Sequence, residues 1–105
     1  RGEQVVGFGS IGPYRHRPAY ATTVEDSVYV DRGARGIGVG RLLLEDLVER
    51  AAGAGFHAMI GRIVGENEAS ILLHRRCGFE LVGTEREVGR KHGRWLDVVE
   101  LQRLL

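Results

Sequence analysis

The chain has 105 residues, of which 43% are hydrophobic and 28% charged, with 15 basic and 14 acidic side chains and a net charge of +1. This length suits one compact domain, so we expect residues 1–105 to form a single unit, and the near-neutral charge argues against a nucleic-acid partner. No apolar run approaches the roughly 20 residues that a membrane span needs, and the single cysteine, Cys77, cannot form an internal disulfide, which favours the cytoplasm.

Apolar and β-branched residues predict two strands at the start of the chain. Residues 4–11 are apolar and punctuated by glycine, and threonine and valine dominate residues 22–30. Both prolines fall in residues 12–18, which predicts a loop between the two strands. The second strand should end at Asp31-Arg32-Gly33.

The middle of the chain predicts a helix, a strand and a second helix. From Gly38 to Ala54 the apolar residues recur with the period of a helix, and a glycine follows directly. Residues 57–64 form an apolar run that predicts a strand. Asn67 is a good N-cap for the second helix, and Gly78 stands where a glycine commonly ends a helix.

The end of the chain predicts two more strands, over residues 80–88 and 95–101, joined by the polar stretch 89–93. The complete order is strand, strand, helix, strand, helix, strand, strand. This order predicts an α/β fold with a mixed sheet.

The most informative segment is Arg35-Gly36-Ile37-Gly38-Val39-Gly40-Arg41, between a predicted strand and a predicted helix. Glycines let a backbone approach a ligand closely, and the free N–H groups of a helix start favour an anion such as pyrophosphate. The segment lacks the lysine of a P-loop and the spacing of the dinucleotide fingerprint. On these residues alone, glycines that merely form a tight turn are the alternative.

Two motifs resemble those of the GNAT N-acetyltransferases. Arg35, Gly38 and Gly40 satisfy [Gln/Arg]-x-x-Gly-x-[Gly/Ala], which is similar to the acetyl-CoA pyrophosphate loop of that family, and residues 67–79 resemble its other cofactor motif. The resemblance implies the GNAT (acyl-CoA N-acyltransferase) fold, an α/β fold with a mixed, mostly antiparallel central sheet and flanking helices. It also implies acetyl-CoA as cosubstrate, with no metal.

Two further segments narrow the resemblance to the phosphinothricin and methionine sulfoximine acetyltransferases. Residues 23–30 (TVEDSVYV) look like the strand before the cofactor loop, and residues 91–98 (KHGRWLDV) resemble the signature Lys-[His/Phe]-Gly-x-Trp-x-Asp. This subgroup implies direct transfer of an acetyl group, in a ternary complex, to the amine of a small amino-acid-like substrate. Phosphinothricin, methionine sulfoximine and methionine sulfone are the candidates.

The same resemblance implies three catalytic residues. Glu25 matches the proposed general base, for which a solvated edge carboxylate is the alternative. His74 takes the position of a general acid near the departing sulfur, or is a partly exposed helix residue. His92 is a substrate-pocket residue or relay, or a polar loop residue.

The remaining site residues follow from the same comparison. Tyr20 and Trp95, together with Glu25 and His92, are expected to border the substrate. Some relatives carry an arginine where Ala21 stands, so the residue that holds a substrate carboxylate is open. The residues expected to bind acetyl-CoA are Val28, Tyr29, Val30, Arg35, Gly36, Ile37, Gly38, Val39, Gly40, Arg41, Asn67 and Ser70.

Members of this family carry a first strand and two helices before the strand that begins this chain. We therefore expect an incomplete chain of a longer acetyltransferase, and the relatives imply a homodimer. Two alternatives keep the fold: an acetyltransferase for another amine, such as a polyamine or a protein N-terminus, and a non-catalytic module that binds acyl-CoA. An acidic pocket would favour the polyamine, and an anion-binding arginine the amino acid.

Overall fold

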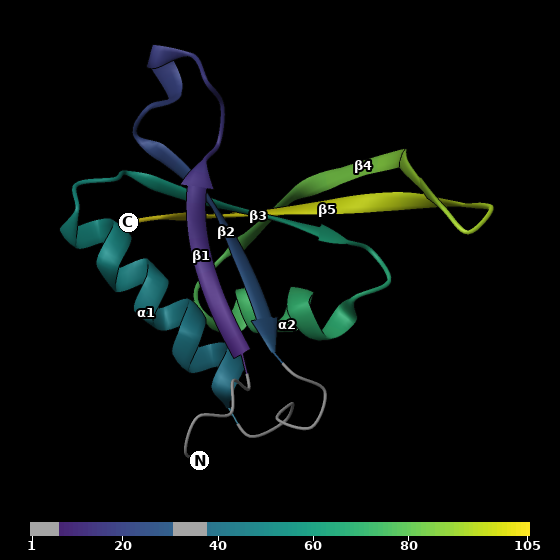
Figure 1. Ribbon diagram of the computed structural model, residues 1–105, viewed down its shortest axis with the longest axis horizontal. Helices are drawn as coiled ribbons and strands as arrows, with labels where there is room; N and C mark the ends of the chain where they lie inside the picture. Colours follow the sequence, from purple (N-terminus) through teal and green to yellow (C-terminus); the bar gives the residue numbers. More distant parts are fainter. Residues whose placement is uncertain (1–6, 31–37) are drawn as a thin grey trace.

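The computed structural model describes residues 7–30 and 38–105, which form strands, two α-helices and one short 3-10 helix (Figure 1). Their order confirms the predicted sequence of strands and α-helices. The elements are β1 (Gly7–Pro13), η1 (Pro18–Tyr20), β2 (Thr23–Val30), α1 (Val39–Gly53), β3 (Ala58–Val64), α2 (Glu68–Arg76), β4 (Glu80–Lys91) and β5 (Arg94–Leu104).

The strands form one five-stranded sheet in the order β1-β2-β3-β5-β4. The β2–β3 pair is parallel, whereas β1–β2, β3–β5 and β4–β5 are antiparallel. The chain therefore has the predicted α/β class and the predicted mixed, mostly antiparallel sheet. None of the helices within the described ranges has the length and apolar character to cross a membrane.

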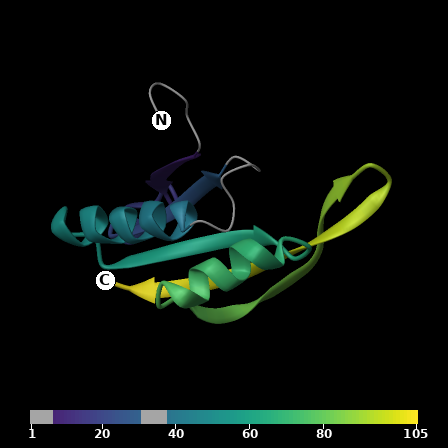
Figure 2. The same ribbon diagram turned by 90° about the horizontal axis from the view of Figure 1, so that it is seen from below.

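Both α-helices pack against one face of the sheet. Figure 2, which looks from below, shows them in front of the strands. Leu44 of α1, Met59 of β3 and Leu101 of β5 are fully buried and form the centre of the core. Burial of such side chains is the main source of stability in a domain of this size. The opposite face of the sheet carries no helix from the described residues.

The β4–β5 hairpin is longer than the sequence predicts. The polar stretch 89–93 was expected to be a connection, but β4 continues to Lys91 and β5 starts at Arg94. Only His92 and Gly93 form the turn, with φ of 51° and 74°, as a tight two-residue hairpin turn requires. The hairpin projects beyond the rest of the sheet (Figure 1). Its outer part therefore lacks the one-sided burial that makes a strand visible in a sequence.

Candidate functional site

The strands β2 and β3 run side by side only briefly and then diverge. They pair in parallel over three residue pairs, from Thr23–Ala58 to Glu25–Ile60. β2 continues to Val30, and β3 continues to Val64 as the partner of β5. Figure 1 shows the two arrowheads pointing in different directions. The last five residues of β2 thus lie beyond the pairing with β3 that the described residues make.

The hydrogen bonds at the start of β2 show which of its backbone groups point toward β3. The Thr22 carbonyl accepts hydrogen bonds from the N–H groups of His57 (2.8 Å) and Ala58 (3.3 Å) at the start of β3. Backbone groups alternate in direction along a strand. The Asp26 C=O and both backbone groups of Val28 therefore point toward the side on which β3 has moved away, beyond the last strand pair Glu25–Ile60. They are available to an extended ligand.

The start of α1 offers a second set of backbone donors. Gly38 is its N-cap, with φ of +83°, a left-handed conformation that favours glycine. A glycine has no side chain with which to cap the helix, so the first N–H groups of α1 keep their capacity to bind an anion. Val39, Gly40 and Arg41 supply these groups. The predicted loop residues Arg35, Gly36 and Ile37 lie outside the described residues.

The second helix begins differently. The Asn67 side-chain oxygen accepts a hydrogen bond from the Ser70 N–H at 3.2 Å, which confirms Asn67 as an N-cap. Gly78, just past the end of α2, has φ of +87°, as expected of a glycine that ends a helix. The Asn67 amide nitrogen and the Ser70 hydroxyl are the side-chain groups left for a ligand here.

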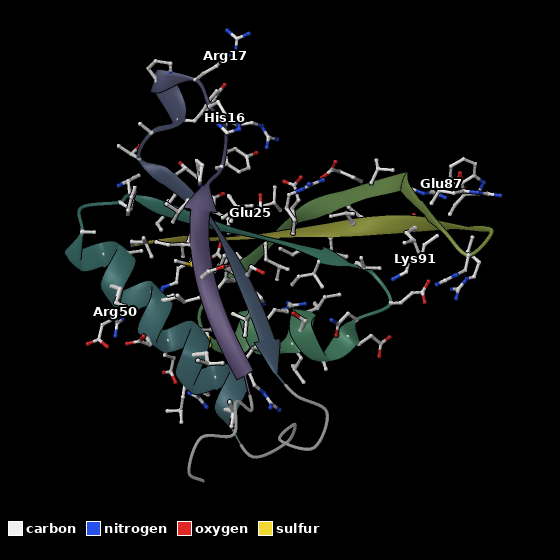
Figure 3. All side chains as sticks on the ribbon, in the orientation of Figure 1. His16, Arg17, Glu25, Arg50, Glu87 and Lys91 are labelled. Carbon is white, nitrogen blue, oxygen red and sulfur yellow. The ribbon has the colours of Figure 1, made fainter. Side chains whose placement is uncertain are left out.

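Glu25 lies on the face of the sheet that the helices do not cover. Its neighbours Val24 and Asp26 are buried on the helix side, and side chains alternate along a strand. Glu25 is half-buried at the centre of the sheet (Figure 3). It stands at the last position that β2 pairs with β3, directly beside the diverging segment.

The same face carries a charged cluster around Arg62 of β3. Its guanidinium pairs with Glu85 of β4 at 2.6 Å and with Glu100 of β5 at 3.5 Å. The hydrogen bond to Glu85 raises the pKa of Arg62 against the opposing effect of burial, and the charges of Glu85, Glu100 and Glu25 add to the rise. Glu25 therefore lies within the electrostatic field of this cluster.

His74 is placed differently from the expectation of a partly exposed helix residue. Its ring is only 2% exposed. Nε2 lies 2.8 Å from Asp26 Oδ1, and Nδ1 lies 2.8 Å from the Ser70 carbonyl oxygen. Both ring nitrogens thus face acceptors inside the core, and the ring lies on the opposite face of the sheet from Glu25. In this arrangement neither ring nitrogen is free for a thiolate, and the role of His74 as general acid stays a prediction.

The His74–Asp26 pair makes the stability of the chain depend on pH. Burial lowers the pKa of His74, but the hydrogen bond and charge of Asp26 and the hydrogen bond to the Ser70 carbonyl outweigh it, so the pKa lies above its ordinary value of 6.5. The folded chain thus binds this proton more tightly than the unfolded chain. The resulting stability is fully present below about pH 6.5 and is lost as pH rises through the folded pKa.

We therefore expect the free energy of unfolding to contain a component that decreases as pH rises above neutrality. Denaturant titrations across that range should detect it in the unmodified chain. The variant His74→Gln, which cannot titrate, should lack that component. An identical pH profile for both proteins would contradict the assignment.

The other predicted site residues are more exposed. Tyr20 in η1 is 45% exposed and packs edge-on against Tyr14, with ring centroids 6.3 Å apart. Trp95 is 59% exposed, and Arg90 stacks over its ring at 4.4 Å. His92 is a turn residue of the β4–β5 hairpin. Figure 3 places its neighbour Lys91 on the hairpin, well away from Glu25. Within one chain, the structure does not bring His92 to Glu25.

Cys77 is part of the core. It is 4% exposed, and burial raises the pKa of its thiol. A buried thiol with a raised pKa is a poor nucleophile. In the described part of the chain, no group of three or more His, Cys, Asp or Glu side chains is arranged to hold a metal ion.

Three residues close to His74 and Glu25 were not predicted from the sequence. Asp26, Gly61 and Arg62 were given no role, yet they pair with or support the predicted residues. Asp26 lies two positions after Val24, so both side chains point to the same, core-facing side of the strand. A charged residue is unusual there. Gly61 interrupts an apolar strand, which often indicates a close approach of another group. These two signals could have located the pair.

The chain belongs to the acetyltransferase (GNAT) family, whose model matches residues 1–79. It is 48% identical to a phosphinothricin N-acetyltransferase of Streptomyces coelicolor over 98% of this chain and 60% of the relative. It is also 48% identical to an L-methionine sulfoximine/L-methionine sulfone acetyltransferase of Pseudomonas aeruginosa, over 94% of this chain and 58% of the relative. The chain thus spans about three fifths of the length of these curated relatives.

Solved structures show the same likeness. A phosphinothricin acetyltransferase from Sinorhizobium meliloti, in complex with AcCoA, superposes with a TM-score of 0.91 at 47% identity, over 95% of this chain and 54% of that one. A ribosomal-protein-alanine N-acetyltransferase from Brucella melitensis superposes with a TM-score of 0.95 at 48% identity, over all of this chain and 65% of that one. The GNAT fold expected from the sequence motifs is confirmed.

Proposed function

We propose that this chain is part of an acetyl-CoA-dependent N-acetyltransferase. The proposed acceptor is the amino group of a small amino-acid-like substrate of the phosphinothricin or methionine sulfoximine type. The observation that carries the proposal is the divergence of β2 from β3 beyond Glu25. It leaves strand backbone groups and the glycine-started helix α1 free to hold one long ligand. The relatives that share this chain's sequence over nearly its whole length support the acceptor class.

The residues present fit acetyl-CoA. The free backbone groups of Val28 and Val30 suit the amides of the pantetheine arm, and the N–H groups at the start of α1 suit the pyrophosphate. The backbone of Tyr29, which was also predicted to bind the cofactor, points to its partner Phe8 on β1. Arg41 is half-exposed there and pairs with Glu45 at 3.3 Å, a weak surface pair that an anion can displace. We also infer contacts from Asn67 and Ser70. When bound, acetyl-CoA supplies the acetyl group as an activated thioester.

Glu25 is the proposed general base. An α-ammonium must lose a proton before its nitrogen can attack a thioester carbonyl, and a carboxylate at the mouth of the diverging strands can accept that proton directly or through water. A free N–H of β2, such as that of Val28, can stabilise the negative charge that develops on the carbonyl oxygen. In this proposal the transfer is direct, within a ternary complex.

A substrate carboxylate needs a cationic partner in the acceptor site. Ala21 stands where some relatives carry an arginine, so another cation must hold a substrate carboxylate. Arg15 is one candidate, since it stacks over Tyr14 at 4.0 Å in the same β1–β2 connection as Tyr20. The likeness to the Brucella melitensis enzyme favours a protein N-terminal alanine as the second candidate acceptor.

A thiol-release assay tests the proposal. Acetyl-CoA is offered with phosphinothricin, methionine sulfoximine, methionine sulfone, spermidine or a peptide that begins with alanine. Release that requires one of the amino acids supports the proposed acceptor, and release with the peptide alone supports the second candidate. Calorimetric binding of acetyl-CoA without release from any acceptor would indicate a binding module. Failure of the folded chain to bind acetyl-CoA would refute the proposal.

We also infer a homodimer in the cytoplasm. The edge strand β4 exposes Leu81, Val82 and Val88, and an exposed apolar edge favours association with another chain. The β4–β5 hairpin is the part of this chain that can bring His92 and Trp95 to a partner. Sedimentation of the purified protein tests the dimer.

A further inference from the structure

The point where β2 and β3 separate contains a side chain from α2. The last strand pair is Glu25–Ile60, so continued pairing would place Asp26 opposite Gly61. Both residues face the helix side of the sheet, as the burial of Val24 and Met59 at the preceding pair shows. His74 lies over Gly61 at this position and bonds to Asp26 at 2.8 Å.

The imidazole of His74 fills the space that a side chain on Gly61 would need. A Cβ built on Gly61 would lie 2.7 Å from His74 Cδ2, 2.8 Å from His74 Nε2 and 3.3 Å from Asp26 Oδ2. These distances are shorter than van der Waals contact, so only glycine fits beneath the ring. The missing side chain at Gly61 of β3 therefore leaves the space, called the seat below, that the His74 imidazole of α2 occupies.

The ring is held in this seat from several directions. The Ser70 carbonyl fixes Nδ1 at 2.8 Å and Asp26 fixes Nε2. Phe79 packs edge-on against the ring, with centroids 4.9 Å apart. A side chain that is 2% exposed and bonded at both nitrogens cannot leave without breaking these contacts. The imidazole is thus fixed on the helix face of the sheet, over Gly61 of β3 and bonded to Asp26 of β2.

Asp26 connects this imidazole to the backbone groups of the site. Its carboxylate accepts a hydrogen bond from His74, and its C=O points toward the side that β3 has left. The other carboxylate oxygen, Oδ2, is buried and has no hydrogen-bond partner among the described residues. The Asp26 side chain is therefore retained in the core by the hydrogen bond that Oδ1 accepts from His74 Nε2. Losing that bond would leave a buried charge unpaired, which is costly.

We propose that His74 and Asp26 form a wedge, seated on Gly61, that keeps β2 from continuing its pairing with β3. The wedge holds the Asp26 C=O and the backbone groups of Val28 open to a ligand. That this ligand is coenzyme A rests on the proposed function. His74 then acts as a positioning residue, through Asp26 and β2, and takes no part in the chemistry.

The variants His74→Ala and His74→Gln test the wedge. Alanine removes the imidazole, so β2 and β3 can pair further. Glutamine keeps much of the bulk and a donor for Asp26 Oδ1. Three quantities are measured on the whole chain at neutral pH: the dissociation constant of coenzyme A, the kcat and KM of acetyl transfer, and the hydrogen exchange of the Val28 amide. Thermal unfolding verifies that each variant is folded.

With the wedge removed, His74→Ala should bind coenzyme A about tenfold or more weakly, because strand backbone groups are no longer free to bond to it. The Val28 amide should exchange more slowly as it gains a partner on β3. His74→Gln should bind coenzyme A within about threefold of the unmodified chain. This pattern supports the wedge.

Two patterns would overturn it. Equal loss of kcat in both variants, with unchanged coenzyme binding, would make His74 a catalytic acid. A lower melting temperature with unchanged binding and exchange would make it a core residue only. If the unmodified chain binds no coenzyme A but Val28 exchange still slows in His74→Ala, the proposed function fails and the wedge stands.

Gly61→Ala provides the same test if His74→Ala does not fold. The added methyl group must displace the imidazole while leaving every charge and donor in place. Weaker coenzyme binding and altered Val28 exchange are again expected. Unchanged values in a folded Gly61→Ala protein would contradict the proposal.

Discussion

Replacing Glu25 by glutamine should lower kcat for acetyl transfer by about 10²- to 10⁴-fold, the usual contribution of a general base. The substitution keeps the size and hydrogen-bonding reach of the side chain and removes only its capacity to take a proton. Glu25 faces away from the core, so the fold should tolerate the change. The affinity for acetyl-CoA should stay the same, because the proposed contacts to the cofactor come from the backbone of β2 and from α1.

Steady-state kinetics with the best acceptor of the thiol-release assay measure the effect, and calorimetry measures cofactor binding. Glu49→Gln, on the exposed side of α1, is the matched control and should leave both quantities unchanged. Full activity of Glu25→Gln would exclude Glu25 as the base. A loss of cofactor binding would instead assign the residue to the cofactor site.

Replacing Gly40 by aspartate should weaken acetyl-CoA binding by about a hundredfold or more. Gly40 lies in the first turn of α1, where the proposed pyrophosphate binds. A carboxylate there would repel the anion, and such like-charge contacts cost several kcal/mol. The same carboxylate suits the positive end of the helix dipole, so the folded chain should be as stable as before, or slightly more stable.

Binding and stability are thus expected to change independently in Gly40→Asp, which separates a cofactor effect from misfolding. Calorimetry and thermal unfolding measure the two quantities. Ala52→Asp adds the same charge to the exposed far end of α1. It should leave binding unchanged and lower stability slightly, because a carboxylate opposes the negative end of the dipole. Equal binding by both variants would place the pyrophosphate elsewhere.

Most of the fold could be predicted because its elements bury one face and end at recognisable residues. The apolar stripe of α1 and the Asn67 cap of α2 both appear in the structure at their predicted places. The short helix η1 was not predicted, since its residues are not buried and give no periodic pattern. The β4–β5 hairpin was predicted too short for the same reason.

The site was less predictable than the fold, because its geometry depends on which strands adjoin. Motif resemblance singled out Glu25 and His74 but gave no indication that they lie on opposite faces of the sheet. That separation follows from pairing between β2 and β3, whose residues are more than thirty positions apart in the chain. The buried bond between Asp26 and His74 likewise joins residues 48 positions apart. No local pattern specifies such a contact.

The adjacency of Glu25 and Asp26 places two identical charges under opposite constraints. One carboxylate is accessible from the uncovered face, and the other is held in the core by a histidine. Side chains alternate between the two faces of the sheet, and only this alternation decides which carboxylate faces the core. Inserting a single residue at the start of β2 would exchange their surroundings, placing Glu25 beside the imidazole and Asp26 on the open face. A change of two residues would restore the faces but put a valine beside the imidazole, so every change of length at the start of this strand removes the bond between Asp26 and His74.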